Sequence, residues 1–270
     1  MAERSGPGGL LAGIEGLVCD MDGVLYRGDE AVPGAGEAIS FLRARRVRVL
    51  FCTNNSRYTV EHYAERLAGM GLPVSPEEIL TSGVVTAEVL AGRGFKGKAA
   101  MVLGGEGVRA ALTDAGLDVT RAQESSPADV VVVGLDPEFD YAKLAKAAAA
   151  VRDGAVFVAT NADATFPAPG GLLPGAGSIL AAVEAASGRK AEVMGKPHPP
   201  MTAAIARRFE GLRRVAIVGD RADTDLVAGE ELGWKKVLVL SGVTSPHEAE
   251  AVAPQPDAIL PSLADIRTLL

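Results

Sequence analysis

The chain has 270 residues, a formal net charge of −7 at pH 7 and 48% hydrophobic residues. This length and apolar content suffice for one large domain or two modest ones. The acidic balance gives no overall basic field that would attract nucleic acid or anionic lipid, so neither is expected as a partner.

The cysteine content and the hydropathy pattern point to a cytoplasmic protein. There are 2 cysteines, Cys19 and Cys52, so no disulfide framework is indicated. The first residues lack the basic-then-apolar pattern of a secretion signal. No uncharged run approaches the ~18 apolar residues of a membrane span. We therefore expect a soluble protein with no membrane partner.

Short β-branched runs alternate with Ala- and Leu-rich helical patterns along the whole chain. Strands are predicted over 15–20, 47–52, 99–103, 129–134, 155–159, 214–219, 236–240 and 257–260. Helices are predicted over 35–46, 59–70, 82–92, 107–116, 139–152, 176–187, 200–210, 223–232 and 261–269. Alternation of this kind predicts an α/β fold with a parallel sheet.

Polar residues of catalytic type follow the predicted strands 15–20, 47–52 and 214–219, whereas the middle strands end in Gly-rich or Asn/Asp turns. This asymmetry predicts a core domain made from both ends of the chain with a second α/β domain inserted between them. The expected division is a core domain of 1–84 and 191–270 with an insert of 85–190.

Asp20 and Asp22 follow the first apolar run, and a glycine comes directly after them. Side chains at i and i+2 of a strand point the same way, and open α/β sheets bind ligands at the carboxyl ends of their strands. Buried like charges raise one another's pKa unless a cation lies between them. The pair therefore indicates a metal ion, a shared proton, or both. A solvated Asp-Gly turn is the alternative.

Two further segments carry groups that could bind an anion. Thr53, Asn54 and Asn55 follow a predicted strand, and their side chains and backbone N–H groups could cradle a phosphate. Taken alone, such a segment is more often a plain turn or helix cap. Lys196 is held between a glycine and a proline just before a helix. It could present its ammonium to an anion or be a surface lysine in a rigid loop.

A fourth segment is again acidic. Asp220 follows the strand 214–219, and Asp223 and Asp225 open the next helix. Acidic residues at a helix start are stabilising on their own, so Asp223 could be a cap, but Asp220 is harder to explain in that way. Three carboxylates from two strand ends can hold one hard cation, and Mg²⁺ takes few protein carboxylates.

In chain order the segments read Asp-x-Asp-Gly, Thr-Asn-Asn, Gly-Lys-Pro and Gly-Asp-x-x-x-Thr-Asp. With this order the chain resembles the haloacid dehalogenase superfamily of phosphatases. It is most similar to subclass IIA, the large-cap branch that contains p-nitrophenyl phosphatase-like, phosphoglycolate, glycerol-phosphate and pyridoxal-phosphate phosphatases. The resemblance runs from Gly16 to about Thr244 and includes 159–167 and 173–177. It implies a Rossmann-like parallel-sheet core with an inserted α/β cap.

The resemblance also implies roles for the carboxylates. Asp20 would be the nucleophile that forms an aspartyl-phosphate, and Asp22 would protonate the leaving alkoxide and then activate water. Mg²⁺ would be bound by Asp20, the backbone carbonyl of Asp22 and Asp220, with Asp225 supporting the site directly or through water. An acid at Asp22 favours phosphoester hydrolysis over dehalogenation, because a halide leaves without a proton.

By the same resemblance, Thr53, Asn54 and Lys196 would bind the transferring phosphoryl oxygens, with Asn55 in the same phosphate-binding segment. Substrate choice would lie in the cap, in a loop that carries Asn161, Asp163 and Phe166. A histidine that contacts the substrate in pyridoxal-phosphate phosphatases aligns with Phe166. This difference argues mildly against pyridoxal phosphate and leaves small aliphatic phosphates as candidates.

The prediction is thus a Mg²⁺-dependent phosphatase that acts on a small phosphorylated metabolite. Phosphotransfer to another acceptor, as in a phosphomutase, is one alternative. A catalytically silent binding protein is another, but it should lose Asp20, Asp22, Lys196 or Asp220, and all are present. Pairing through the cap into a homodimer is left open. Cys19 and Cys52 are expected to face packed core, and their redox activity is left open.

Overall fold

The computed structural model describes residues 9–119, 127–168 and 171–270. The chain divides into two compact units. The first contains the chain up to Cys52, Ala64–Ile79 and Thr202–Leu270, and the second contains Thr53–Tyr63 and Leu80–Met201. The predicted insert, 85–190, lies within the second unit, which also takes in residues on either side of it. The predicted domain boundaries stay predictions.

The first unit contains most of a six-stranded sheet with the order β14-β13-β12-β1-β4-β5. Strands β1, β4, β12, β13 and β14 pair in parallel. The central strand β1 is wholly buried, which explains its unbroken apolar sequence. The strand bounds are β1 (Gly16–Cys19), β4 (Arg48–Thr53), β5 (Ile79–Thr81), β12 (Val215–Gly219), β13 (Lys235–Val239) and β14 (Ala258–Leu260).

The helices beside this sheet are α1 (Ala35–Ala44), α2 (Val60–Gly69), α7 (Pro199–Arg208) and α8 (Val227–Leu232). Helix α1 shows why they form: its buried residues recur on one face, at Ala35, Ala38, Ile39 and Leu42. The 3₁₀ segments η1 (Pro76–Glu78) and η4 (Glu248–Glu250) are single turns.

Two predicted helices differ from expectation. The segment predicted over 261–269 is a 3₁₀ helix, η5 (Leu263–Leu269), and its buried residues Leu263, Ile266 and Leu269 are spaced by three, which matches the 3₁₀ period. The segment predicted over 223–232 is split into a π-helical turn, η3 (Ala222–Leu226), and the short helix α8.

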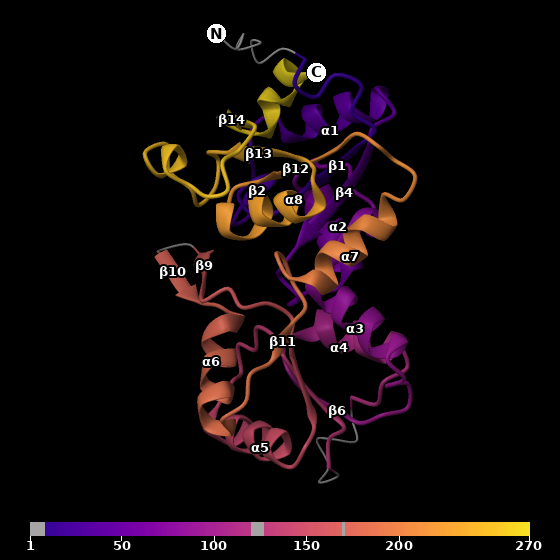
Figure 1. The fold of residues 1–270 in the computed structure, drawn as a ribbon, viewed down its shortest axis with the longest axis vertical. Helices are drawn as coiled ribbons and strands as arrows, with labels where there is room; N and C mark the ends of the chain where they lie inside the picture. The colour runs from indigo at the N-terminus through magenta and orange to yellow at the C-terminus, as the bar shows by residue number, and fades with distance from the viewer. Residues whose placement is uncertain (1–8, 120–126, 169–170) are drawn as a thin grey trace. The chain divides into compact units, whose positions relative to one another are not determined.

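The second unit has a four-stranded parallel sheet with the order β11-β8-β7-β6. Val130 and Val132 of β7 pack in one apolar cluster with helices α3 and α4, and Val131 and Val133 pack in another with α5 and α6. The helix pairs therefore cover opposite faces of the sheet (Figure 1). The bounds are β6 (Ala100–Leu103), β7 (Val130–Val133), β8 (Val156–Ala159), β11 (Glu192–Val193), α3 (Ser82–Gly92), α4 (Glu106–Asp114), α5 (Tyr141–Arg152) and α6 (Ala176–Ser187).

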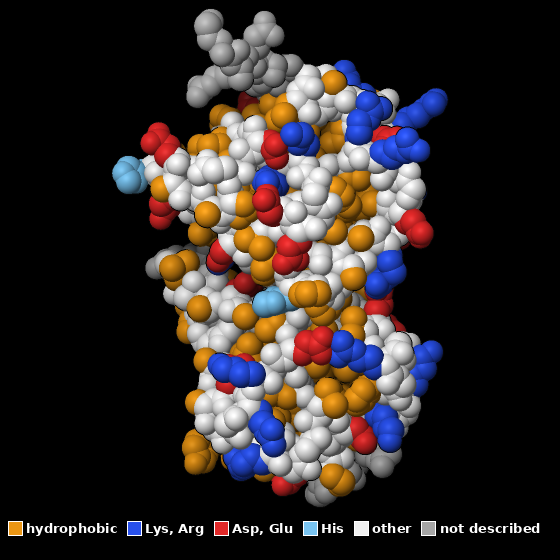
Figure 2. Space-filling model, viewed as in Figure 1, with side chains coloured by type: hydrophobic (Ala, Val, Ile, Leu, Met, Phe, Trp, Pro, Cys, Tyr) orange, Lys and Arg blue, Asp and Glu red, His pale blue; other side chains and the backbone are white. Residues whose placement is uncertain are grey.

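Every predicted strand is present, and the strands that the sequence did not reveal are short. Four of these strands form two antiparallel ribbons: β2 (Tyr26–Arg27) pairs with β3 (Glu30–Ala31), and β9 (Thr165–Ala168) pairs with β10 (Gly171–Pro174). Within the described ranges, no helix has the length and apolar character needed to cross a membrane. On the face drawn in Figure 2, basic and acidic side chains are interspersed.

Candidate active site

Asp20 and Asp220 follow neighbouring parallel strands of the first unit. Strand β1 ends at Cys19, β12 ends at Gly219, and the register pairs Cys19 with Val218. The backbone N–H of Asp20 donates to the carbonyl of Val218 over 2.9 Å, so the pairing continues to the first aspartate. Both carboxylates therefore leave the sheet at the edge where α/β folds bind their ligands.

Asp20, Asp220 and Asp225 form a buried acidic cluster. Their exposed fractions are 8%, 1% and 1%, and one carboxylate oxygen from each lies within 4.8 Å of the others. Two oxygens on opposite sides of an octahedral Mg²⁺ ion lie about 4.1 Å apart, so this donor set and spacing suit that ion. Asp22 lies outside the cluster, and its backbone carbonyl as a ligand stays a prediction.

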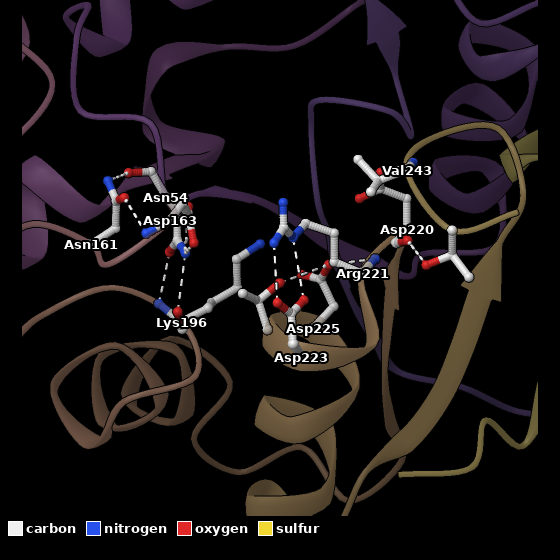
Figure 3. A network of polar contacts seen from close by, with 11 residues as sticks. Asn54, Asn161, Asp163, Lys196, Asp220, Arg221, Asp223, Asp225 and Val243 are labelled. Carbon is white, nitrogen blue, oxygen red and sulfur yellow. Dashed lines mark hydrogen bonds and ion pairs between the residues drawn. The ribbon is translucent and has the colours of Figure 1, made fainter. Parts of the chain in front are cut away.

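Asp225 reaches the cluster from the π-helical turn η3, directly after β12. Room for it is made at Gly219, because a Cβ atom built there would overlap the Asp225 carboxylate. Such turns are rare in proteins overall, and those that occur are often found at functional sites. Asp223 instead forms an exposed ion pair with Arg221 at 3.0 Å, as Figure 3 shows. Of the two acids in this turn, only Asp225 belongs to the cluster.

Asp22 lies in the tight turn that follows β1. Gly23 has φ +79°, a left-handed conformation that a side chain would strain, and its N–H donates to the carbonyl of Tyr26 over 2.8 Å. The turn brings the buried Tyr26 back onto Asp22, whose Oδ2 accepts a hydrogen bond from the phenolic hydroxyl over 2.9 Å. Tyr26 was missed by the sequence reasoning, although its i+4 spacing within a turn was a usable signal.

A second group that the sequence reasoning missed holds Asp220. The backbone N–H of Val243 donates to Asp220 Oδ2, and the Thr244 hydroxyl donates to the Asp220 carbonyl, each over 2.6 Å (Figure 3). The Ser241 hydroxyl donates to the carbonyl of Gly23, also over 2.6 Å. These residues follow β13, which ends at the same sheet edge as β12. The polar residues that follow this strand in the sequence could have indicated that the segment belongs to the site.

The predicted phosphate-binding residues lie in the second unit. Thr53, Asn54 and Lys196 are buried, with exposed fractions of 2%, 8% and 3%. Asn54 joins two of the predicted segments through its amide, because Oδ1 accepts from the Lys196 N–H over 2.7 Å and Nδ2 donates to the Lys196 carbonyl over 3.0 Å. Gly195 permits this approach, since a Cβ there would lie 2.6 Å from Asn54 Oδ1.

Asn54 also contacts two of the residues predicted for the cap. Its Nδ2 donates to Oδ2 of Asp163 over 3.2 Å, and its backbone carbonyl accepts from Nδ2 of Asn161 over 2.8 Å (Figure 3). Asp163 and Asn161 are themselves linked, because the Asp163 N–H donates to Asn161 Oδ1 over 3.1 Å. Asn161 and Asp163 thus brace the end of strand β4.

The remaining predicted residues have local partners. Thr53 Oγ1 accepts from the Asn55 N–H, and Asn55 Oδ1 accepts from the Arg57 N–H, each over 3.0 Å, so this segment is a tight polar turn. Phe166 lies in β9, opposite Leu173 of β10. The structure thus places Asp20, Asp220 and Asp225 together in the first unit, with Asp22 in the turn after β1, and the predicted phosphate-binding and cap residues in the second unit. Their roles stay predictions.

Comparison with known proteins agrees with this arrangement. Residues 17–118 match a model of haloacid dehalogenase-like hydrolases, and residues 193–266 match a second model of the same kind. An acid sugar phosphatase from Staphylococcus haemolyticus is 37% identical over 90% of this chain and 91% of its own length. The chain belongs to the haloacid dehalogenase-like hydrolase family. It is a phosphoric monoester hydrolase of subclass IIA within that family.

Solved structures of the family share the whole fold. A 4-nitrophenylphosphatase from Thermotoga maritima has a TM-score of 0.89 and 34% identity, and the match covers 97% of this chain and 99% of that one. A glycerol phosphate phosphatase from Mycobacterium tuberculosis, solved in complex with magnesium, has a TM-score of 0.87 and 34% identity. That match covers 97% of this chain and 78% of the other.

Proposed function

We propose that the chain is a Mg²⁺-dependent phosphatase that hydrolyses a small phosphorylated metabolite through an aspartyl-phosphate on Asp20. The buried cluster of Asp20, Asp220 and Asp225 at neighbouring strand ends carries this proposal, because carboxylates gathered so closely repel one another unless a cation neutralises them. The magnesium complex of the related glycerol phosphate phosphatase supports the choice of ion.

The first step transfers the phosphoryl group to the protein. A carboxylate oxygen of Asp20 attacks phosphorus in line, the bond from phosphorus to the ester oxygen breaks, and Asp22 gives its proton to the departing alkoxide. Mg²⁺, held by Asp20 and Asp220 with support from Asp225, would supply positive charge that stabilises the phosphoryl oxygens in the transition state. A hydrogen bond from the Tyr26 hydroxyl to Oδ2 of Asp22 positions the carboxyl group for this proton transfer.

The second step returns Asp20 to its starting form. Asp22, now ionised, takes a proton from water as the water oxygen attacks phosphorus. The bond from phosphorus to Asp20 breaks, inorganic phosphate leaves, and Asp22 is protonated again. The same residue thus serves as acid and then as base, so that the cycle closes without an external proton donor.

In this proposal, Thr53, Asn55 and Lys196 bind the phosphoryl oxygens, and Asn54, whose side-chain amide is held by Lys196 and Asp163, contributes its backbone N–H. The ammonium of Lys196 would balance charge that a transferring phosphoryl group spreads over its oxygens. The hydrogen bonds between Asn54 and the Lys196 backbone support this role, since they fix the loop that carries the lysine. A fixed donor loses less conformational entropy when it binds an anion.

The substrate class we favour is a sugar phosphate or a glycerol phosphate. The related proteins named for acid sugar phosphatase and glycerol phosphate phosphatase activity support this choice. Phe166, where pyridoxal-phosphate phosphatases place a histidine, also favours a small aliphatic phosphate. Phosphoglycolate has the same small size and belongs in the same comparison.

Phosphate release tests the proposal directly. Purified protein is incubated with sugar phosphates, glycerol phosphate, phosphoglycolate, pyridoxal phosphate and nucleotides, with Mg²⁺ and with a chelator. We expect metal-dependent release with the highest kcat/KM for a sugar or glycerol phosphate. Release that persists in chelator would contradict the role of the metal, and a nucleotide preference would contradict the substrate class.

The covalent intermediate has its own test. In Asp22→Asn the second step lacks its base, so 4-nitrophenyl phosphate, whose leaving group needs little protonation, should give one nitrophenolate per protein and then stop. The stalled protein should carry one phosphoryl group by mass spectrometry and lose it to hydroxylamine, as acyl phosphates do. A protein that turns over steadily without such a group would exclude the aspartyl-phosphate.

A further inference from the structure

The loop of Ser241, Gly242, Val243 and Thr244, here called the β13 loop, lies outside the four motifs that identify the family. It contacts Asp220, one of the metal-binding residues proposed above: the backbone N–H of Val243 binds the carboxylate, and the side chain of Thr244 binds the main-chain carbonyl. We propose that the β13 loop is a positioning element that sets the affinity for Mg²⁺ by fixing the carboxylate of Asp220. This inference rests on the proposed metal dependence.

The contacts to Asp220 fix its direction. The Val243 N–H binds Oδ2 over 2.6 Å, and the Thr244 hydroxyl binds the main-chain carbonyl over 2.6 Å. Hydrogen bonds to an ionised acceptor are about twice as strong as neutral ones. Because one carboxylate oxygen and the backbone of the same residue are both held, the direction in which the other carboxylate oxygen points is set as well.

Two glycines close around the same carboxylate. A Cβ atom at Gly242 or at Gly23 would overlap Asp220 Oδ2, so both backbones pack directly against it. The Ser241 hydroxyl joins the two segments by its hydrogen bond to the Gly23 carbonyl, and the Ser241 carbonyl accepts from Nε of Arg27. The β13 loop therefore connects Asp220 to the turn that carries Asp22, and it is itself held in place.

The buried hydroxyl of Thr244 gives the sharpest variant. Removal of the groups that orient a metal ligand typically lowers metal affinity by about 10- to 100-fold. Thr244→Val keeps the shape of the side chain and removes the hydroxyl, and Thr244→Ser keeps the hydroxyl. We expect Thr244→Val to raise the Kd for Mg²⁺ by at least about tenfold and Thr244→Ser to stay close to the wild type.

The experiment is a calorimetric titration of the full chain with Mg²⁺ in the absence of substrate, on variants whose circular dichroism matches the wild type. Val243→Ala is the matched control, because the Val243 side chain is 47% exposed and the contact is made by its backbone. Its Kd should equal that of the wild type. Phosphatase activity of Thr244→Val should recover at saturating Mg²⁺, which a loss of fold would not allow.

Ser241→Ala is the second variant and removes the bond to Gly23 without touching Asp220. We expect a smaller rise in Kd from it, in the same direction. If the wild type binds Mg²⁺ and the Kd is unchanged in both Thr244→Val and Ser241→Ala, this inference is wrong and the proposed metal dependence stands. Failure of the wild type to bind Mg²⁺ would overturn the proposed metal dependence and this inference with it.

Discussion

The phenolic hydroxyl of Tyr26 donates a hydrogen bond to Oδ2 of Asp22 over 2.9 Å, and the guanidinium of Arg66 lies 4.6 Å from the centre of the Tyr26 ring. The tyrosine is buried and the bond is partly buried, so water competes with this bond less than it would at the surface. Arg66 is in turn held by the Gly28 carbonyl and by Asp29. Tyr26 therefore positions one oxygen of the proposed acid–base residue.

Loss of the Tyr26 hydroxyl should matter most where the leaving group needs a proton. In Tyr26→Phe we expect kcat/KM for an alkyl phosphate such as glycerol phosphate to fall by about 10- to 100-fold, because a misplaced acid protonates the alkoxide poorly. The value of kcat/KM for 4-nitrophenyl phosphate should change little, because its leaving group needs little protonation. The role of Asp22 as base in the second step does not enter, since kcat/KM reports only the steps through phosphoryl transfer. The ratio of the two values is the measurement.

Tyr141→Phe is the control for Tyr26→Phe, because the Tyr141 side chain is 84% exposed on α5. It should leave both rates at the wild-type level. An equal fall for both substrates in Tyr26→Phe would mean that the tyrosine serves only the packing of the turn.

Asp20→Asn should abolish turnover and leave the fold intact. An amide oxygen is a poor nucleophile, so the loss in kcat should be on the order of 10⁴-fold or more. Removal of one charge from the buried cluster also relieves repulsion between like charges. In chelator, the Tm of Asp20→Asn should therefore equal or exceed that of the wild type. Wild-type activity in this variant would refute the assignment of the nucleophile.

The strands and the order of the motifs could be read from the sequence because each is a local pattern. The apolar runs before Asp20 and Asp220 predicted strands, and both strands are present with those residues at their ends. The buried positions of Cys19 and Cys52 followed from strand alternation and are confirmed. The alternation of side chains along a strand and the position of each residue in it were enough to predict these features.

The contacts of Asn54 and of the β13 loop could not be read in this way. Asn54 binds the backbone of Lys196 and the side chain of Asp163, and a sequence states neither distance. Val243 acts through its N–H, which every residue except proline carries, so its side chain gives no hint of the role. The helix predicted over 223–232 begins instead within the π-helical turn Ala222–Leu226, because the apolar and polar pattern of five residues does not distinguish the two kinds of turn.

Asn54→Ala should loosen the loop that carries Lys196. The substitution leaves the buried Lys196 N–H without this acceptor, which costs about 1–3 kcal/mol. Hydrogen exchange of peptides that cover 193–196 should become faster, while peptides that cover β12 should not change. Asn55→Ala removes only a local bond to the Arg57 N–H and is the matched control. Unchanged exchange at 193–196 in Asn54→Ala would contradict the bracing role.

Phe166 should influence which substrate is used. It lies in the hairpin of β9 and β10, where Leu172 is 67% exposed. We expect Phe166→His to change the ratio of kcat/KM between glycerol phosphate and pyridoxal phosphate more than it changes hydrolysis of 4-nitrophenyl phosphate. Leu172→Ala, on the partner strand, is the control. A uniform loss across substrates would show that Phe166 serves the fold of the hairpin.

Glu78 provides a stability prediction that depends on pH. Burial alone would raise its pKa, but the Ser75 N–H and the Arg43 guanidinium hold the pKa below the ordinary glutamate value. A carboxyl with a lowered folded-state pKa stabilises the protein above its unfolded pKa of about 4.3, and the stabilisation is lost as the pH falls through the lower folded value.

Glu78→Gln should therefore lower stability at pH 7 by about 0.5–1 kcal/mol, a small effect because the ion pair is partly exposed and screened by solvent. The difference from the wild type should shrink as the pH falls below about 4. Urea denaturation at a series of pH values measures it, with the exposed neighbour Glu77→Gln as control. A difference that is constant with pH would mean that the charge of Glu78 has no part in it.

The position of β1 between β4 and β12 has a consequence for synthesis of the chain. Its neighbour β4 leaves the ribosome soon after it, but β12 begins only at Val215. At translation speeds of about 5–20 residues per second, one edge of an apolar strand lacks its native partner for on the order of tens of seconds. Nascent chains of this protein should need protection during that interval, and no truncated product that ends before β12 can assemble the acidic cluster.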